Sequence, residues 1–485
     1  MTKNGAKKIT SGFLWTFGER ITAQLVSTIV TIVLARLLDP AHYGIISIVT
    51  VLISICNVFV IGGFGSAIVQ KKDADDMDYN TAFILSFSMS VLLYLLLFFA
   101  SPYIAGFYKM EQLIWVIRVM AIRLIIASMN TIQQANIQRK MEFKKFFIAT
   151  LFGTVISGFV GVYLAYSGFG VWALVAQYLT NTTVDTLVLC FVSTWFPKLE
   201  FSVKRAKRIF AFGWKVLVTQ LVFTLQADIR SLIVGKVFGP SKLAYYDQGM
   251  KYPALLVNNI NTAVNKVMFP AFSREQDNIE RLKEMLRKAI KIGVYVLAPI
   301  LIGFAAVANN FVSGVLTEKW VFAVPYIRIF CIMYLTRPLE TACHQAMLAL
   351  GRSDLPLYII IVVNICAFAS VLAAVFVFNS VLLIAIGAMV VQFISLNCFM
   401  FFSSRLLKYR LKEQLSDIMP AIAASCFMGI AVSIVNLISL SSIIKLLIQV
   451  IVGGIVYIAI SFLFKFEAFD YLLVILKGYL KKRNF

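Results

Sequence analysis

The sequence has little charge, few histidines and no paired cysteines. Charged residues make up 14% of its 485 residues, against roughly 25% in an average soluble protein. Its only histidines, His42 and His344, have no third ligand type near them at metal spacing, so no metal site is expected. All seven cysteines lie in apolar stretches without C-x-x-C spacing, and we interpret them as small hydrophobic residues.

Nucleotide and enzyme motifs are also absent. No G-x-x-x-x-G-K-[ST] loop occurs, so ATP hydrolysis is not expected. The glycine-rich residues 62–65 lie inside an apolar run, where small residues permit close helix packing. The expected external loops are short and contain few acids, namely Asp39, Glu111 and Glu318. We therefore expect neither a membrane glycosyltransferase nor another enzyme, with no catalytic residue and no cofactor.

Long apolar runs dominate what is present. Hydrophobic residues make up 60% of the chain and the mean hydropathy is +0.86, which predicts an all-α, polytopic integral membrane protein. Because a bilayer needs about 20 apolar helical residues per crossing, about fourteen spans are predicted. The first run lacks a small-residue cleavage site and is expected to be a retained span. The spans lie near residues 11–36, 44–69, 79–106, 113–135, 146–166, 170–193, 209–234, 243–270, 289–308, 322–350, 355–377, 382–404, 415–438 and 442–464.

The placement of the basic residues predicts the orientation. The chain has 45 Lys and Arg against 23 Asp and Glu, a net charge of +22. These residues form short clusters between apolar runs, which argues against a nucleic-acid partner and favours the positive-inside pattern of a multi-pass membrane protein. Both termini are then cytoplasmic, because the opposite loops contain only six basic residues, namely Arg36, Lys109, Lys236, Lys242, Lys319 and Lys445.

An internal repeat predicts the domain organisation. Leu34-Ala35-Arg36-Leu37-Leu38-Asp39-Pro40 recurs six spans later as Val234-Gly235-Lys236-Val237-Phe238-Gly239-Pro240. Two parallel six-helix halves are typical of transporters with a binding site between the halves near the midplane; alternatively, both segments are merely proline-containing helix-end turns. The predicted parts are residues 1–200, 201–410, two extra helices over 411–465 and a basic amphipathic cytoplasmic tail over 466–485.

Charged residues inside the spans are the candidate site. A charge at mid-span costs at least about 2.5 to 3.5 kcal/mol if it faces lipid, so it is expected to face an interior. The candidate substrate-binding cations of a central cavity are Arg20, Arg123, Lys215, Arg230, Lys251 and Arg337. The polar lining is Gln24, Asn130, Gln134, Gln226, Asn258, Asn261 and Asn265, and the possible coupling acids are Asp228, Asp247 and Glu340.

This cationic, amide-lined set suits a ligand that combines phosphate and sugar. Guanidinium groups pair with phosphate oxygens and amides bond hydroxyls. Two alternatives stay open: the pairs Asp247 with Lys251 and Arg337 with Glu340 are structural, or cations near span ends extend to the interface. The residues concerned by the second alternative are Arg118, Lys266 and Arg328.

Several segments resemble the bacterial polysaccharide exporters, the O-antigen, colanic-acid and teichuronic-acid type flippases of the multidrug, oligosaccharidyl-lipid and polysaccharide exporter superfamily. They are residues 34–40 followed by Tyr43-Gly44, then 65–70, 138–143, 168–174 and 269–273. The resemblance covers most of spans 1 to 10, whereas the last four spans match only in hydropathy.

The resemblance implies a fourteen-helix, alternating-access flippase in the bacterial plasma membrane. It would move an undecaprenyl-pyrophosphate-linked oligosaccharide to the outer leaflet for surface polysaccharide biosynthesis. The expected partners are that glycan, membrane lipid, H+ or Na+ as coupling ion, and polysaccharide polymerase and chain-length machinery. An ion-coupled multidrug antiporter of the same superfamily is the alternative, and a non-transporting scaffold stays open.

Overall fold

The computed structural model describes residues 24–471, except 62, 72, 141 and 194, together with residue 473. The side chains of several other residues, including those at 215 and 262–267, also lie outside the described set. Within the described part every regular element is a helix, which confirms the all-α prediction. After a helix at Gln24–Leu37, the α-helices are α2 (Pro40–Ile61), α3 (Phe64–Gln70), α4 (Asp76–Tyr108), α5 (Leu113–Lys140), α6 (Phe143–Tyr166), α7 (Val171–Val192), α8 (Val203–Phe238), α9 (Pro240–Arg274), α10 (Ile279–Phe311), α11 (Val324–Tyr334), α12 (Arg337–Ala349), α13 (Asp354–Phe376), α14 (Val381–Leu407), α15 (Leu411–Ile434) and α16 (Ser442–Leu463). Three short helices complete the set: the π-helix η1 (Val312–Leu316) and the 3₁₀-helices η2 (Glu318–Ala323) and η3 (Val435–Leu437).

Within the described residues, each predicted span coincides with one or more helices. Eleven helical segments of the described part are long and apolar enough to cross a membrane. Three further spans fall on the shorter helix Gln24–Leu37 and on α7 and α9, whose polar residues lower their hydropathy. The chain is therefore a polytopic membrane protein.

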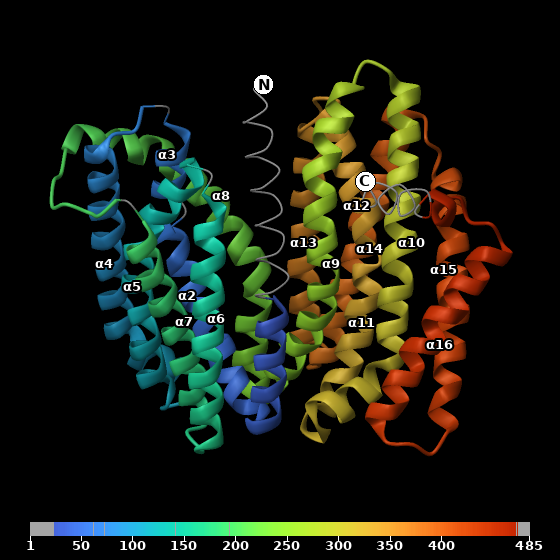
Figure 1. Ribbon diagram of the computed structural model, residues 1–485, viewed down its shortest axis with the longest axis horizontal. Helices are drawn as coiled ribbons and strands as arrows, with labels where there is room; N and C mark the ends of the chain where they lie inside the picture. The colour runs from blue at the N-terminus through green and yellow to red at the C-terminus, as the bar shows by residue number, and fades with distance from the viewer. Residues whose placement is uncertain are drawn as a thin grey trace, which may run out of the picture. The chain divides into compact units, whose positions relative to one another are not determined.

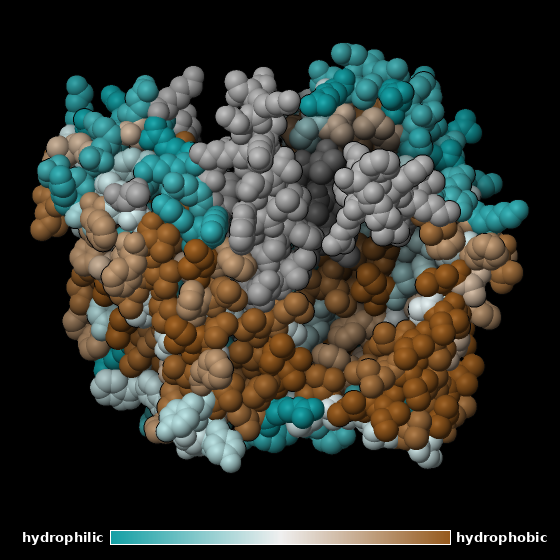
Figure 2. Space-filling model, viewed as in Figure 1, coloured by the Kyte–Doolittle hydropathy of each residue, from teal (hydrophilic) through white to brown (hydrophobic). Residues whose placement is uncertain are grey.

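The chain forms two compact units, Met1–Ala244 and Tyr245–Phe485. Unit 1 contains α2 to α8 and the first residues of α9, and unit 2 contains the rest of α9 and α10 to α16. Within each unit the long helices run side by side (Figure 1). Apolar side chains cover the middle of α6 and of α16, whereas polar side chains gather toward the helix ends (Figure 2). The divisions predicted at residues 200 and 410 are based on the sequence repeat, whereas the compact units are defined by packing. The predicted divisions stay a prediction.

Two close backbone contacts in unit 1 join α2 to the first residue of α9 and the residue before α3 to α8. A Cβ atom on Gly44 would lie 1.9 Å from the carbonyl oxygen of Pro240, and one on Gly63 would lie 2.7 Å from that of Gly213. Both repeat copies form the same turn, because Pro40 and Pro240 each begin a helix, a position that suits proline. Glycine at 44 lets the turn before α9 lie directly against α2.

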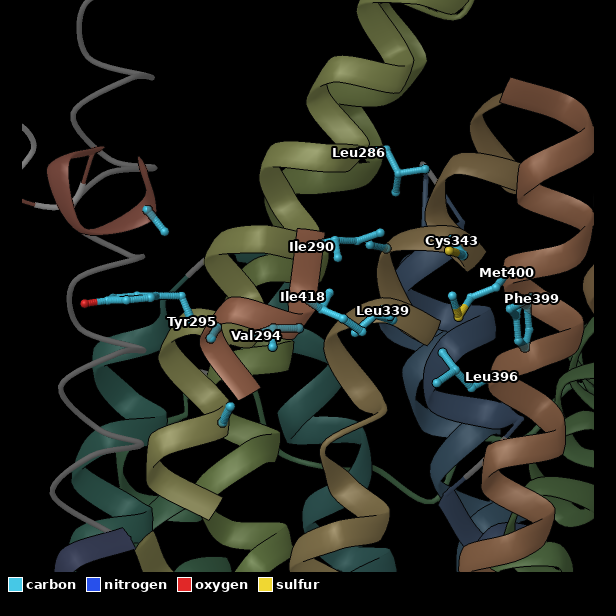
Figure 3. Close-up of a cluster of buried hydrophobic side chains, with 14 of the residues drawn as sticks. Leu286, Ile290, Val294, Tyr295, Leu339, Cys343, Leu396, Phe399, Met400 and Ile418 are labelled. Carbon is cyan, nitrogen blue, oxygen red and sulfur yellow. The ribbon is translucent and has the colours of Figure 1, made fainter. Parts of the chain in front are cut away.

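Unit 2 is built around α10. Its apolar core joins α10 to α12, α14 and α15 (Figure 3) through residues that include Leu286, Ile290, Val294, Leu339, Cys343, Leu396, Phe399, Met400 and Ile418. Polar contacts add α16: Asn310 Nδ2 donates to Gln449 Oε1 at 2.9 Å and to Asn436 Oδ1 at 2.7 Å. Since lipid tails are as apolar as leucine, packing and such interhelical hydrogen bonds are what hold membrane helices together.

Candidate functional site

Arg123 of α5 is bound to α7 inside unit 1. Its Nε donates to Thr182 Oγ1 at 2.7 Å, and its guanidinium carbon lies 5.3 Å from the centroid of the Tyr178 ring. A hydroxyl and an aromatic face bind part of the guanidinium, and no carboxylate among the described residues forms an ion pair with it. Arg123 therefore holds α5 against α7.

The amides of α5 form a second link to α7. Asn130 Nδ2 donates to Thr186 Oγ1 at 3.0 Å and to Asp185 Oδ2 at 3.4 Å, and Gln134 Nε2 donates to Asn130 Oδ1 at 3.3 Å. Because Asn130 is only 5% exposed, this network sets the register of the two helices. The α7 residues are absent from the site predicted from the sequence, although Gln177, Asn181 and Asp185 share one helix face at steps of four.

Helix α8 carries an acid, Asp228, and a cation, Arg230, which lie two residues apart but have different surroundings. Asp228 Oδ2 accepts a hydrogen bond of 2.7 Å from Ser54 Oγ of α2. Arg230 is half-buried and forms no ion pair with any residue that the structure describes. The nearby Gln226 is also half-buried. Asp228 is thus bonded to α2, whereas Arg230 has no ion-pair partner among the described residues.

In unit 2, Glu340 of α12 is bonded mainly to α14. Its carboxylate accepts hydrogen bonds from Ser395 Oγ at 2.9 Å and from Gln392 Nε2. Arg337 lies 3.8 Å from the same carboxylate, and its side chain is 42% exposed. The pair therefore exists as the structural alternative supposes, but the closer partners of Glu340 come from α14.

Four of the predicted site residues form a polar stripe on α9, within the predicted span at residues 243–270. Asp247 and Lys251, one helical turn apart, are both half-buried, as is Asn261, whereas Asn258 is exposed. All four belong to unit 2. The stripe follows one face of α9, as its spacing predicts.

Some predicted site residues receive no structural description. Arg20 and the side chains of Lys215 and Asn265 lie outside the described residues. In unit 1, Gln24 Nε2 donates to Thr28 Oγ1 at 3.4 Å within its own helix. Within unit 1, Gln134 is hydrogen-bonded to Asn130, and within unit 2, Arg337 is paired with Glu340. That all the predicted residues line one site stays a prediction. No cluster of three metal ligands occurs among the described residues.

An ionic cluster fastens the start of α8 to the start of α4. Arg205 contacts both Asp75 and Asp78, at 3.2 Å from Asp78 Oδ2, and Lys71 also contacts Asp78. The hydrogen bond from Arg205 lowers the pKa of Asp75 to about 2, with help from the backbone amide of Asp78. Asp75 also caps α4, accepting from Asp78 N at 3.0 Å. This cluster explains why α8 packs with unit 1.

Comparison with known proteins gives a family and a fold. A family described as "Polysaccharide biosynthesis protein" matches residues 33–325. The chain is 27% identical over 354 residues to the "Teichuronic acid biosynthesis protein TuaB" of Bacillus subtilis (strain 168), with 73% of each chain covered.

Two solved structures share the fold. "Lipid II flippase MurJ, inward closed conformation" aligns with a TM-score of 0.75 at 12% identity, over 94% of this chain and 98% of that chain. An inward-facing "multidrug resistance MATE family transporter of the MOP superfamily" aligns with a TM-score of 0.61 at 16% identity, over 79% and 96%. The resemblance seen in the sequence is confirmed, and the chain belongs to the polysaccharide biosynthesis protein family.

Proposed function

We propose that this membrane protein is a flippase, which moves an undecaprenyl-pyrophosphate-linked oligosaccharide repeat unit from the inner to the outer leaflet of the bacterial plasma membrane for surface polysaccharide biosynthesis. The observation that carries the proposal is Arg230, a cation in a span with no ion-pair partner among the described residues. A charged side chain is costly in lipid, and charges inside spans typically line a substrate or ion pathway. The family and the fold shared with a lipid II flippase support this interpretation.

The chemistry of the cargo follows from the candidate residues. A pyrophosphate matches the cations Arg230, Lys251 and Arg337, since guanidinium groups bond phosphate oxygens bidentately. Sugar hydroxyls match carboxamides such as Gln226 and Asn261. We propose that these groups, with Arg20, Arg123 and Lys215, line a cationic central cavity that is exposed to each side of the membrane in turn.

The lipid tail and the energy source complete the proposed mechanism. The outer face of α16 exposes Leu447, Val450, Ile451 and Ile455, so the undecaprenyl tail can remain in lipid along α15 and α16 while the headgroup crosses. Membrane potential or an H+ or Na+ gradient would drive the cycle, with Asp228, Asp247 or Glu340 as coupling acids. Polysaccharide polymerase and chain-length machinery would take the product.

An ion-coupled multidrug antiporter is the alternative, because a multidrug transporter shares the fold. Cationic drugs require acidic or aromatic groups in the cavity. Asp228 and Glu340 are already hydrogen-bonded to neighbouring helices of their own units. The surplus of cations therefore favours the flippase.

The proposal is tested by removing two cations: Arg230, which has no ion-pair partner among the described residues, and Arg337, whose neighbour Glu340 is bonded mainly to α14. We expect Arg230→Gln and Arg337→Gln each to lower surface glycan output at least tenfold, because a charged hydrogen bond to phosphate contributes more than about 1.4 kcal/mol. Arg328→Gln is the matched control, since Arg328 is exposed on α11 and its Nε contacts only a backbone carbonyl at 3.4 Å. Normal output from both variants, at normal membrane levels, would overturn the proposal.

A further inference from the structure

One end of unit 1 contains a pocket that the proposed transport path does not use. The start of α4, the end of α5 and the linker between α7 and α8 enclose a cavity of about 600 Å³. In Figure 1 these segments meet at the upper end of α4. The lining residues that matter are Tyr79, Asn136, Arg139, Lys140, Trp195 and Lys198.

The walls of this pocket are held in place by contacts within unit 1. Arg139 Nη1 donates to the carbonyl of Ala74 at 3.0 Å and to Tyr79 Oη at 3.3 Å. The rings of Tyr79 and Trp195 lie 5.5 Å apart. The backbone amide of Lys198 donates to Asn80 Oδ1 at 3.0 Å, which fastens the linker without using the Lys198 ammonium. The pocket is therefore preorganised for a ligand.

The polar groups of the pocket indicate an anion. Among the described lining residues, three are basic, namely Arg139, Lys140 and Lys198, and one is acidic, namely Asp76. Asn136 lines the pocket at 5% exposure, yet its carboxamide makes no hydrogen bond with any residue in the described part of the chain. From the wall of the pocket, the carboxamide of Asn136 can therefore donate a hydrogen bond to a ligand oxygen.

The linker beside the pocket indicates a lipid. Phe196, Leu199 and Phe201 expose 61%, 92% and 47% of their surfaces, at the end of a membrane unit where basic residues gather. Aromatic and apolar side chains next to cations are typical of the membrane interface. We propose that this pocket binds the phosphate headgroup of a membrane lipid, either a polyprenyl pyrophosphate or an anionic phospholipid, whose chains lie beside the linker. The binding does not depend on the proposed transport activity.

Native mass spectrometry of the full-length protein in detergent tests this proposal. The probes are geranylgeranyl pyrophosphate, phosphatidylglycerol and, as a phosphate-free control, diacylglycerol. We expect Lys198→Gln and Asn136→Leu to weaken binding of a phosphate lipid, by about tenfold for the charge. Lys204→Gln should change binding less than twofold, because Lys204 is exposed on α8 and does not line the pocket.

The outcomes also identify the source of the phosphate. Loss of geranylgeranyl pyrophosphate binding alone indicates the polyprenyl carrier, loss of phosphatidylglycerol binding alone indicates bulk phospholipid, and loss of both indicates a general phosphate-headgroup site. Unchanged binding of both lipids to both folded variants, or equal binding of diacylglycerol, would overturn the proposal. Glycan export measured on the same variants reports separately on the flippase proposal.

Discussion

At the scale of single residues, Asp75 links the start of α4 to α8 by its charge. Its pKa is lowered from 3.8 to about 2 by the hydrogen bond from Arg205. A lowered carboxyl pKa adds stability that is complete above about pH 4 and is lost as the pH falls toward 2. We expect Asp75→Asn, which keeps a good helix cap, to lose less melting temperature between pH 5 and pH 3 than the wild type does. Equal falls in melting temperature in the variant and the wild type would show that the Asp75 charge does not contribute to stability.

At Gly44 the neighbouring backbone leaves no room for a side chain. Because an added Cβ would lie 1.9 Å from the Pro240 carbonyl oxygen, Gly44→Ala must displace α2 from the turn that precedes α9. We expect a loss of about 1–3 kcal/mol, the usual cost of overpacking, seen as a lower melting temperature in detergent. Gly106→Ala is the control, since nothing lies within 4 Å of its added Cβ; equal melting temperatures for the two variants would contradict the close approach.

At the scale of elements, three amides hold α16 in unit 2. Asn310 of α10 donates to Gln449 of α16 and to Asn436 of η3. We expect Asn310→Leu to cost about 0.6–1.7 kcal/mol, the range for interhelical hydrogen bonds in membranes. Adding Gln449→Leu should cost less than its own single change, because the partner is already lost.

The control for this network is Asn397→Leu. Asn397 is exposed on α14 and its amide bonds only to the carbonyl of Phe393 in its own helix. The melting temperature of the Asn397→Leu variant should stay close to that of the wild type. Strict additivity of the Asn310 and Gln449 changes would show that the two amides do not act as one network.

The helices could be predicted from the sequence, but most of their partners could not. Apolar runs and helical spacing are local, so they predict the positions of α5, α8 and α9 and of the polar residues within them. The bond between Ser54 and Asp228 joins residues 174 positions apart, and nothing in either span specifies the other. The predicted set also omitted Asp185 of α7, although its spacing from Gln177 and Asn181 was visible in the sequence.

At the scale of the whole molecule, sequence repeat and packing divide the chain differently. The repeat predicts a division near residue 200, whereas the compact units meet after Ala244. The difference comes from α8, which the Arg205 cluster and the contact between Gly63 and Gly213 hold in unit 1. Such contacts depend on side chains that meet only after folding, and a repeat in the sequence does not report them.

The most direct measurement follows the lipid-linked glycan itself. The protein is depleted in its native bacterium, lipid-linked oligosaccharides are measured by mass spectrometry, and a membrane-impermeant sugar probe reports their leaflet. The flippase account predicts that one complete repeat unit accumulates on the inner leaflet. Unchanged lipid-linked sugars together with altered tolerance to cationic drugs would contradict it and favour the antiporter.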